Sequence, residues 1–485
     1  MHSQYNNLTR MQKILQSILC IFFIGLLLCS CSNTSSFTSS DISLWVVTEE
    51  TVSDGMNYQL NSIAEKFQTA YPNVSINIDI IPNDSTRETY LNTLRDSISS
   101  GNGPDVFLLP TSNVLTLEHP QKYTYVQIDP LFPDVNIAMR KNTFADISSF
   151  YNTDQELNAE ALSDTVMNAG VLNDARYVLP LRFNIPIAYV ADDYIQEKGY
   201  SITALHSGIE SWMNYVISQN DHELACGAEY ISLSIFPNLY DYSCKRVTIT
   251  EEKLEEFLYS YYQVLNLIGD ETSHRNQLTL SLYGYGISKQ FPVHIDMLQN
   301  AMAHAAIALS EGTDLSMYPV RNIEGDAVAS VTYYGAVGSS CSTPEIAYQF
   351  LREFLLEDPQ WELSRPETSA GQYPPLIENS WPVRIKGSVK PLWENYLNNS
   401  LKLRGASSSL YSLKKISMDD SSIPILNEEI DIAIFPIYSS ASNVFSEVNA
   451  YSTQIYSESN EAEIKKLASK FIQNLKNDYI IWEGP

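Results

Sequence analysis

The N-terminal part of the chain alternates strand-like and helix-like patterns, and this order constrains the fold more than any other feature. Residues 42–48 and 106–109 are short apolar runs typical of buried strands, and residues 74–80 alternate apolar with polar residues. Between them, apolar residues recur at helical spacing from Met56 to Phe67 and from Tyr90 to Ile98. The order β-α-β-α-β predicts an α/β fold with a parallel sheet covered by helices.

Further helices are predicted downstream from capping signals and periodicity. One begins at the capping-box sequence Ser207-x-x-Glu210, a second after Thr250, and a third at Thr343-Pro344. A last helix is expected over about 461–475, with its acids early and its lysines late, which complements the helix dipole. The mixture of helices and strands therefore continues along the chain.

Composition narrows the class of protein. The chain has 485 residues, of which 44% are hydrophobic, so it can bury a sizeable core and form two to three domains of ordinary size. It carries 30 Lys+Arg against 57 Asp+Glu, a net charge of −27. Because so acidic a surface repels phosphate, nucleic acid is not expected as a partner.

The first 30 residues differ from the rest of the chain. They contain no acid and two bases, Arg10 and Lys13, followed by the uncharged apolar run Ile18–Cys29. This run is shorter than the ~20 residues needed to cross a bilayer. Bases before a short apolar run are typical of a secretory signal peptide, so residues 1–30 are predicted to be one.

The end of this run resembles a bacterial lipobox. In Leu28-Cys29-Ser30-Cys31, a leucine and a small residue precede a cysteine at the spacing of that motif. The resemblance implies cleavage before Cys31 and attachment of a diacylglyceryl lipid to its sulfur. Residues 31–40 would then be a flexible tether. The alternatives are an ordinary secretory signal with an incidental cysteine, or a short N-terminal anchor.

Three cysteines remain beyond Cys31. Cys226 and Cys244 are close enough in sequence to form a disulfide, which would leave Cys341 free. Alternatively, all three are small buried apolar side chains. The sequence leaves both readings open.

Several separated segments together resemble the extracellular solute-binding proteins of family 1, the carbohydrate-type capture subunits of ABC importers. The segments are Ile42–Thr48, Phe67–Pro72, Val74–Ile81, Gly101–Val106, Pro180–Gly199, Glu210–Tyr215, Gly335–Leu355 and Ile472–Glu483. Their order along the chain carries the resemblance. Between about 270 and 330 the match weakens, and the usual family motif is not evident from Tyr283 to Ala306.

The resemblance implies a two-lobed, periplasmic-binding-protein-like fold with a ligand cleft between lobes joined by crossover strands. Lobe one would comprise residues 41–183 plus 334–385, and lobe two residues 184–333 plus 386–485. The crossovers would lie near residues 184–186 and 332–334. Ligand binding would close the lobes by hinge motion, and a membrane permease would recognise the closed form.

Sugar capture requires aromatic rings against C–H faces and planar polar groups for hydroxyls. Candidates are taken from strand ends, from the crossovers and from one capped helix. They are Glu49, Arg182, Asn184, Trp212, Tyr333 and Tyr334, with Phe183, Trp381 and Trp393 as further aromatic candidates. For Glu49 the alternative is a solvated loop acid. For the two tyrosines it is hinge packing, and for Trp212 it is a place in the core.

Signals of enzymatic chemistry are weak. The chain has no Gly-x-Ser-x-Gly elbow and no phosphate-binding loop. The sequence His222–Cys226 begins like a zincin helix but has a cysteine where the second histidine is required. The seven histidines form no cluster at metal-ligand spacing. No catalytic residue, metal or cofactor is therefore expected.

Together these patterns predict a monomeric, lipid-anchored binding protein on the outer face of the cell membrane. It would capture a small solute, a sugar or oligosaccharide, and deliver it to the permease subunits of an ABC importer. One alternative is a ligand-binding partner of an extracytoplasmic sensor. Another is a secreted polysaccharide hydrolase, since paired carboxylates could come from the 57 acids.

Overall fold

The computed structural model describes twelve parts of the chain. They are residues 42–49, 54–82, 84–111, 130–226, 236, 239–241, 246–268, 293–297, 315–356, 381–384, 430–436 and 461–483. The predicted signal peptide, Cys31, the tether, Cys244 and Trp393 lie outside them, as do the side chains of Cys226 and Trp381. The predictions made for these residues therefore stay predictions.

The N-terminal unit has the predicted β-α-β-α-β order. Its elements are β1 (Ile42–Glu49), α2 (Asp54–Ala70), β2 (Val74–Ile81), α3 (Arg87–Ser99) and β3 (Val106–Pro110). β1 lies between the other two strands and pairs with both in parallel, from Ile42 opposite Val74 to Glu49 opposite Ile81 on the β2 side. The alternation of apolar runs and helical periodicity therefore predicted this unit correctly.

Four further strands widen this sheet. They are β6 (Val178–Asn184), β12 (Val328–Val337), β13 (Trp381–Pro382) and β14 (Ile432–Ile434), and the strand order is β13-β6-β12-β3-β1-β2. β12 is antiparallel to β6 and β3, and β14 pairs with β12 in parallel. The sheet is thus mixed, and β12 is its central strand.

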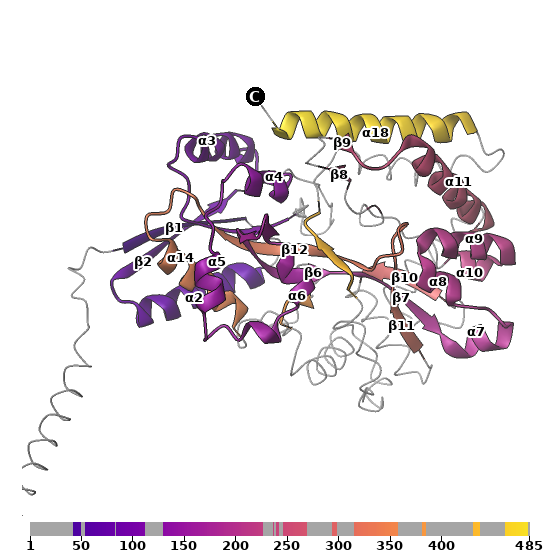
Figure 1. The fold of residues 1–485 in the computed structure, drawn as a ribbon, viewed down its shortest axis with the longest axis horizontal. Helices are drawn as coiled ribbons and strands as arrows, with labels where there is room; N and C mark the ends of the chain where they lie inside the picture. Colours follow the sequence, from indigo (N-terminus) through magenta and orange to yellow (C-terminus); the bar gives the residue numbers. More distant parts are fainter. Residues whose placement is uncertain are drawn as a thin grey trace, which may run out of the picture.

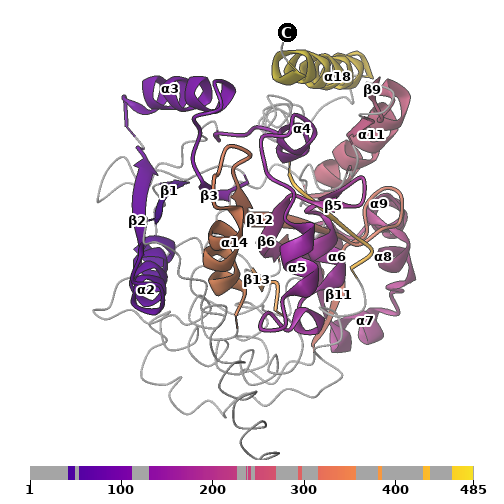
Figure 2. The same ribbon diagram turned by 60° about the vertical axis from the view of Figure 1, so that its left-hand side comes forward.

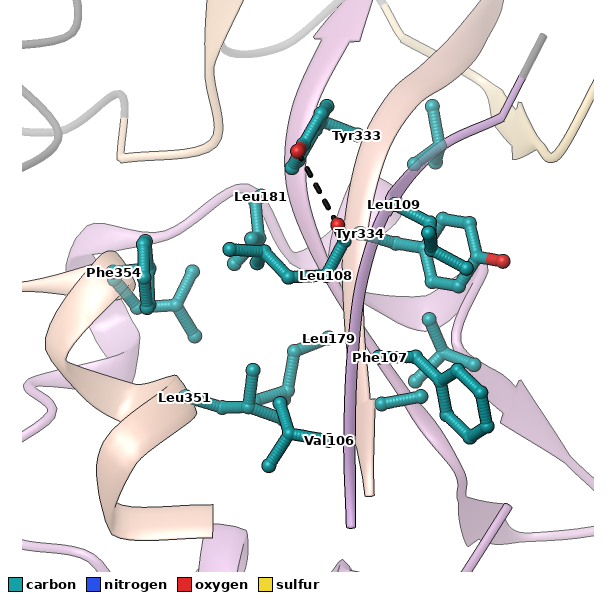
Figure 3. Close-up of a cluster of buried hydrophobic side chains, with 14 of the residues drawn as sticks. Val106, Phe107, Leu108, Leu109, Leu179, Leu181, Tyr333, Tyr334, Leu351 and Phe354 are labelled. Atoms are coloured by element: carbon teal, nitrogen blue, oxygen red, sulfur yellow. Dashed lines mark hydrogen bonds between the residues drawn. The ribbon is translucent and has the colours of Figure 1, made fainter. Parts of the chain in front are cut away.

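Helices cover both faces of this sheet (Figures 1 and 2). α3 lies on one face, whereas α2 and α14 (Pro344–Arg352) lie on the other. Phe67 of α2 and Phe350 of α14 meet edge to face with ring centroids 5.4 Å apart, which joins the two helices over one core. Figure 3 shows Leu108, Leu181 and Leu351 packed together on the α14 side.

Short elements complete this part of the molecule. They are α4 (Val135–Arg140), α5 (Ser148–Thr153), η1 (Ala159–Ala161), α6 (Asp164–Asn168), β4 (Val171–Leu172), β5 (Ala175–Arg176) and η3 (Glu353–Leu355). Asp134 caps α4, because its Oδ1 accepts hydrogen bonds from the backbone N–H groups of Asn136 (2.8 Å) and Ile137 (3.4 Å). The second oxygen of Asp134 is buried, so burial raises its pKa to about 6.

The second unit is built on a smaller antiparallel sheet. Its order is β10-β7-β11, from β7 (Pro186–Ala191), β10 (Val293–Met297) and β11 (Leu315–Pro319). Around it lie α7 (Asp192–Lys198), α8 (Thr203–Ser207), α9 (Ile209–Gln219), α10 (His222–Cys226), α11 (Glu251–Ile268), α18 (Glu461–Glu483) and the hairpin β8 (Tyr240–Asp241) and β9 (Arg246–Val247). α18 lies along α11 at the top of Figure 1.

Two of the predicted helix caps have different outcomes. The backbone N–H of Lys253 donates to Thr250 Oγ1 at 3.2 Å, so the predicted cap of α11 is confirmed. The capping box at Ser207 is wrong. Ser207 ends α8, where its hydroxyl donates to the carbonyl of Thr203, and α9 starts after Gly208 without a side-chain cap.

The buried apolar residues form two separate cores, which defines the two lobes. The first contains Ile187 and Ala327, whereas the second contains Ala188 and Val320. The chain therefore passes between lobes at the start of β7 and again between β11 and β12. By these cores, the first crossing lies between Ile187 and Ala188 and the second between Val320 and Ala327. The sequence predicted crossovers near residues 184–186 and 332–334.

The cores also place the C-terminal segments. Ile430 and Phe435, which flank β14, belong to the first core, although the sequence prediction put them in lobe two. α18 packs in the second core, so the chain passes between the lobes a third time between Phe435 and Ile464. Among the described residues, no helix combines enough length with enough apolar character to cross a membrane.

Candidate functional site

The carboxyl ends of two strands meet beside β12. The first half of β12 pairs with β14, as far as Ser330 opposite Ile434, and its second half pairs with β3 from Tyr333 opposite Pro110. Because β14 is parallel to β12 and β3 is antiparallel, their carboxyl ends point at each other. Ligands of open α/β sheets bind outside strand carboxyl ends where the topology switches.

We call the residues at this junction, Thr111, Val331 and Thr332, the strand break. Thr111 closes it, because its N–H donates to the carbonyl of Thr332 at 3.1 Å and its hydroxyl donates to the carbonyl of Val331 at 2.6 Å. The pairing of β12 with β6 shifts register on both sides of Tyr333. The hydroxyl of Thr332 is enclosed and finds no hydrogen-bond partner among the described residues. The strand break therefore contains a buried hydroxyl whose hydrogen-bonding capacity is not satisfied by the described residues.

Glu49, the first candidate, is the last residue of β1 and lies in a buried ion pair. Its Oε1 accepts from Arg87 Nη2 at 2.9 Å, and its Oε2 lies 2.7 Å from Arg87 Nη1. Glu49 is only 1% exposed, so burial raises its pKa, and the Arg87 guanidinium acts in the opposite direction. The acid expected at the carboxyl edge is there, with both oxygens held by one arginine.

Tyr333 connects the end of β1 with β12. Its hydroxyl donates to the carbonyl of Leu108 at 3.3 Å, as Figure 3 shows, and lies 3.2 Å from Thr48 Oγ1. Burial raises the Tyr333 pKa, the Glu49 carboxylate raises it further, and the Arg182 guanidinium lowers it. Glu49, Arg182 and Tyr333 are therefore close enough to act on one another.

Arg182 and Asn184 lie on β6, directly beside β12. Arg182 pairs in register with Tyr333, and Asn184 pairs with Ser330, so the two flank the strand break. Both are buried, and Asn184 Oδ1 accepts from the backbone N–H of Ile185 at 2.9 Å. The first crossover thus brings a guanidinium and an amide to the same part of the sheet.

Tyr334 and Trp212 lie elsewhere. Figure 3 shows Tyr334 on the sheet face opposite Tyr333, and its ring makes edge contacts with Phe144 (6.5 Å) and Phe435 (5.7 Å). Trp212 is 0% exposed in the core of lobe two, where it stacks on Tyr215 with centroids 5.7 Å apart. In this conformation the structure brings four of the six candidates together and leaves these two in core packing.

Sequence reasoning missed three residues at this site. Arg87 could have been identified from the sequence. A base in the first turn of a helix interacts unfavourably with the helix dipole, so a nearby acid is expected to neutralise it. Thr111 carried a second signal, since it is the first polar residue after a buried strand. Thr332 could not have been identified from the sequence. The apolar run of β12 does not show at which residue its neighbouring strand changes from β14 to β3.

The described residues offer little for metal or thiol chemistry. Among them, no group of three or more His, Cys, Asp or Glu residues could hold a metal ion. Cys341 is half-buried, and burial raises its pKa to about 11, so the thiol stays protonated at neutral pH. His222 Nδ1 lies 3.0 Å from the carbonyl of Leu267, which is a helix-joining contact.

Comparison with known proteins identifies the fold. No family model and no curated protein sequence matches the chain. It is similar to the galacto-N-biose/lacto-N-biose I-binding protein of an ABC transporter from Bifidobacterium longum, with 12% identity, a TM-score of 0.50, and coverage of 90% of this chain and 97% of that one. It is also similar to a de novo designed cysteine esterase, with 13% identity, a TM-score of 0.52, and coverage of 90% and 98%.

A third solved structure, an extracellular solute-binding protein of family 1 from Alicyclobacillus acidocaldarius, shares 14% identity at a TM-score of 0.49 over 91% of this chain and 99% of that one. At such identities the two matches with TM-scores of 0.50 and 0.52 establish the fold alone. The chain has the two-lobed α/β fold of periplasmic solute-binding proteins, so the fold expected from the sequence resemblance is confirmed. The designed esterase shows that this fold alone does not fix a function.

Proposed function

We propose that the chain is a solute-binding protein that captures a small carbohydrate at the strand break, between the two lobes. The observation that carries the proposal is the enclosed hydroxyl of Thr332, next to the first crossover and with no partner among the described residues. A hydroxyl and an amide are the groups that exchange hydrogen bonds with sugar hydroxyls.

The buried charges nearby support a binding role over an enzymatic one. Glu49 is held by Arg87 at both oxygens, and Tyr333 is held by Thr48 and the carbonyl of Leu108. Groups fixed in this way serve as a rigid support for a solute. The solved structure from Bifidobacterium longum, which has this fold, holds lacto-N-biose.

Delivery to a permease and attachment to the membrane complete the proposal. They rest on the sequence resemblance and on the lipobox-like segment that ends at Cys31. Solute capture would close the lobes about the two crossings, and the permease would recognise the closed form. The same capture step would serve an extracytoplasmic sensor, so co-purification with a permease or with a kinase separates the two.

A ligand screen tests the capture step. The measurement uses the chain without residues 1–31, which removes the predicted signal peptide and the lipobox cysteine. Neutral oligosaccharides, peptides, polyamines and metal salts form the panel. A sugar at 100 times its dissociation constant is expected to stabilise the fold by ~2.7 kcal/mol. Stabilisation by peptides or metals alone would contradict the carbohydrate proposal.

A single variant then tests the site. Thr332→Val removes the hydroxyl at nearly constant volume, so affinity for the sugar found in the screen is expected to fall about tenfold, the loss of one hydrogen bond. The melting temperature without ligand should change little. Thr69→Val, at an exposed position of α2, is the matched control. Equal affinities for both variants and the wild type would exclude Thr332 from the site.

A further inference from the structure

The crossings at the start of β7 and between β11 and β12 lie side by side. The N–H of Val320, in the second crossing, donates to the carbonyl of Pro186, in the first, at 2.9 Å. β14 pairs with β12 directly after the second crossing, from Val328 opposite Ile432. A rotation of one lobe against the other must therefore act on these three segments together.

The second crossing contains a small closed turn. Arg321 and Ala327 form an antiparallel bridge at its base, which we call the neck. Asn322 makes the turn rigid, because its Oδ1 accepts from the N–H groups of Glu324 (2.8 Å) and Asp326 (2.9 Å). Residues 322–326 therefore form a fixed unit, and the neck is the place where the chain passes from one core to the other.

The two sides of the neck belong to different lobes. The carbonyl of Arg321 accepts from the N–H of Ile209, the first residue of α9, at 2.8 Å. A side chain at Gly208 would place its Cβ 2.6 Å from the carbonyl oxygen of Asn322, so α9 and the turn are in close contact. Arg321 thus moves with lobe two, whereas Ala327 is part of the core of lobe one.

Asp431, directly before β14, binds both sides of the neck through one oxygen. Its Oδ2 accepts from Arg321 Nη1 at 2.6 Å and from the N–H of Ala327 at 2.9 Å. Its own N–H donates to the carbonyl of Ala327 at 3.0 Å, and its neighbour Ile430 lies in the core of lobe one. The carboxylate therefore connects lobe one to the arginine that moves with lobe two.

We propose that Asp431 is a hinge staple, which holds the two lobes in the arrangement described here until its bond to Arg321 opens or shifts. The Arg321 side chain is 26% exposed and that of Asp431 is 41% exposed, so water can replace the bond during lobe movement. Exposed ion pairs of this kind change an equilibrium by roughly two- to fivefold. The staple would set the fraction of molecules ready to bind, and so the apparent affinity of the cleft.

Amide hydrogen exchange, measured without any ligand, tests the hinge staple. The reporter is the amide of Val320, which joins the two crossings and does not itself bind Asp431. In Asp431→Asn and in Arg321→Gln its exchange is expected to be roughly two- to fivefold faster, because opening of the hinge is more frequent. The double variant should match the single variants, since both remove the same bond.

A matched control and an internal reference separate the hinge from general stability. Glu461→Gln removes an exposed ion pair of α18 with Lys465 (3.1 Å), which lies within one helix of lobe two, and should leave Val320 unchanged. Amides in the centre of β1 and α11 should keep wild-type rates in all variants. Unchanged exchange at Val320, or equal acceleration at these central amides, would overturn the staple. Because no solute is used, a chain that binds no carbohydrate still tests it.

Discussion

At the scale of single residues, the Glu49–Arg87 pair shows what the sequence could and could not reveal. Glu49 was predictable as a polar group at the end of a buried strand. Its partner was not, because Arg87 is 38 residues away and comes near only when α3 packs beside the sheet. Tyr333 and Tyr334 were expected at the hinge, but lie within a ten-residue strand whose residues are nearly all buried. A continuous apolar run does not show where a strand crosses between lobes.

Replacing Arg87 with methionine tests the buried pair. The variant leaves a buried carboxylate without its partner, so the free energy of unfolding at pH 7 is expected to fall by about 3–5 kcal/mol in urea titrations. Burial raises the Glu49 pKa, and a raised pKa gives stability that is present at low pH and lost as pH rises. The difference in free energy of unfolding between wild type and Arg87→Met should therefore become smaller as pH is lowered.

An exposed ion pair provides the control for this variant. Arg246 lies 3.8 Å from Asp241, and its side chain is 70% exposed. Arg246→Met should change the free energy of unfolding by less than about 1 kcal/mol at any pH between 5 and 8. If Arg87→Met cost no more than this, the buried pair would contribute nothing beyond its surface counterpart.

Asp134 predicts a pH dependence of its own. Its pKa is raised from 3.8 to about 6, so its contribution to stability is complete below pH 3.8 and is lost as pH rises through about 6. Asp134→Asn keeps an oxygen that can cap α4 and removes the titration. The variant should gain up to ~3 kcal/mol relative to wild type between pH 4 and pH 7.5.

Asp84 is expected to give a pH dependence of stability opposite in sign to that of Asp134. Asp84 is exposed, and its pKa is lowered by hydrogen bonds from the hydroxyl and the N–H of Thr86. Its stabilising effect is present above pH 3.8 and is lost on acidification. Asp84→Asn should therefore lose stability relative to wild type as pH rises from 3 to 5. Thermal unfolding across pH for both variants would show slopes of opposite sign, and parallel slopes would contradict both assignments.

At the scale of elements, prediction succeeded where periodicity is long and failed where elements are short. β1, α2, β2, α3 and β3 were expected within a few residues of their observed bounds, because each has several apolar residues at one spacing. β13 and β14 have two and three residues and cannot show a period. The start of α9 was misassigned because Gly208, with φ of 124°, separates two helices that the apolar pattern joins.

Gly338, directly after β12, lies in close contact with the backbone that precedes β3. A Cβ at Gly338 would lie 2.0 Å from the carbonyl oxygen of Pro104, and the Gly338 N–H donates to the carbonyl of Asp105 at 2.9 Å. Gly338→Ala must push the two strands apart, so a loss of about 2–4 kcal/mol in the free energy of unfolding is expected. Denaturant titration measures it.

Gly101 is the comparison position for this variant. It has a φ of 75°, and no atom lies within 4 Å of an added Cβ, so only backbone strain opposes a side chain there. Gly101→Ala should cost about 1 kcal/mol. A larger loss at Gly101 than at Gly338 would show that strain, and not the contact between strands, governs both positions.

At the scale of the whole molecule, the order of separated segments predicted the fold better than any single motif. The two cores confirm two lobes joined by crossings, but the lobe limits differ at β14 and at the second crossing. These limits depend on which residues pack together in space, and periodicity along the chain carries no such information. The candidate site followed the same rule. Four of its six predicted residues were brought together because β12 pairs with β6 on one side and with β3 on the other, and β3 pairs with β1.

The membrane anchor is a prediction about the whole molecule. Cys31→Ala is expected to prevent lipid attachment, so the protein should move from the membrane fraction to the soluble extracytoplasmic fraction. Fractionation followed by immunodetection measures this, with Cys341→Ala as the control that should remain at the membrane. Retention of the Cys31 variant at the membrane after cleavage of residues 1–30 would contradict the lipobox assignment.

The carboxyl ends of β3 and β14 face each other beside β12, and this arrangement has a consequence for the evolution of such a protein. β3 ends at Pro110 and β14 at Ile434, and the register of each strand with β12 is set by residues before these ends. Insertions and exchanges there leave strand register untouched, because register is set upstream. New solute preferences could thus arise by loop replacement on an unaltered frame, which makes these two exits the first places to graft loops when a different specificity is wanted.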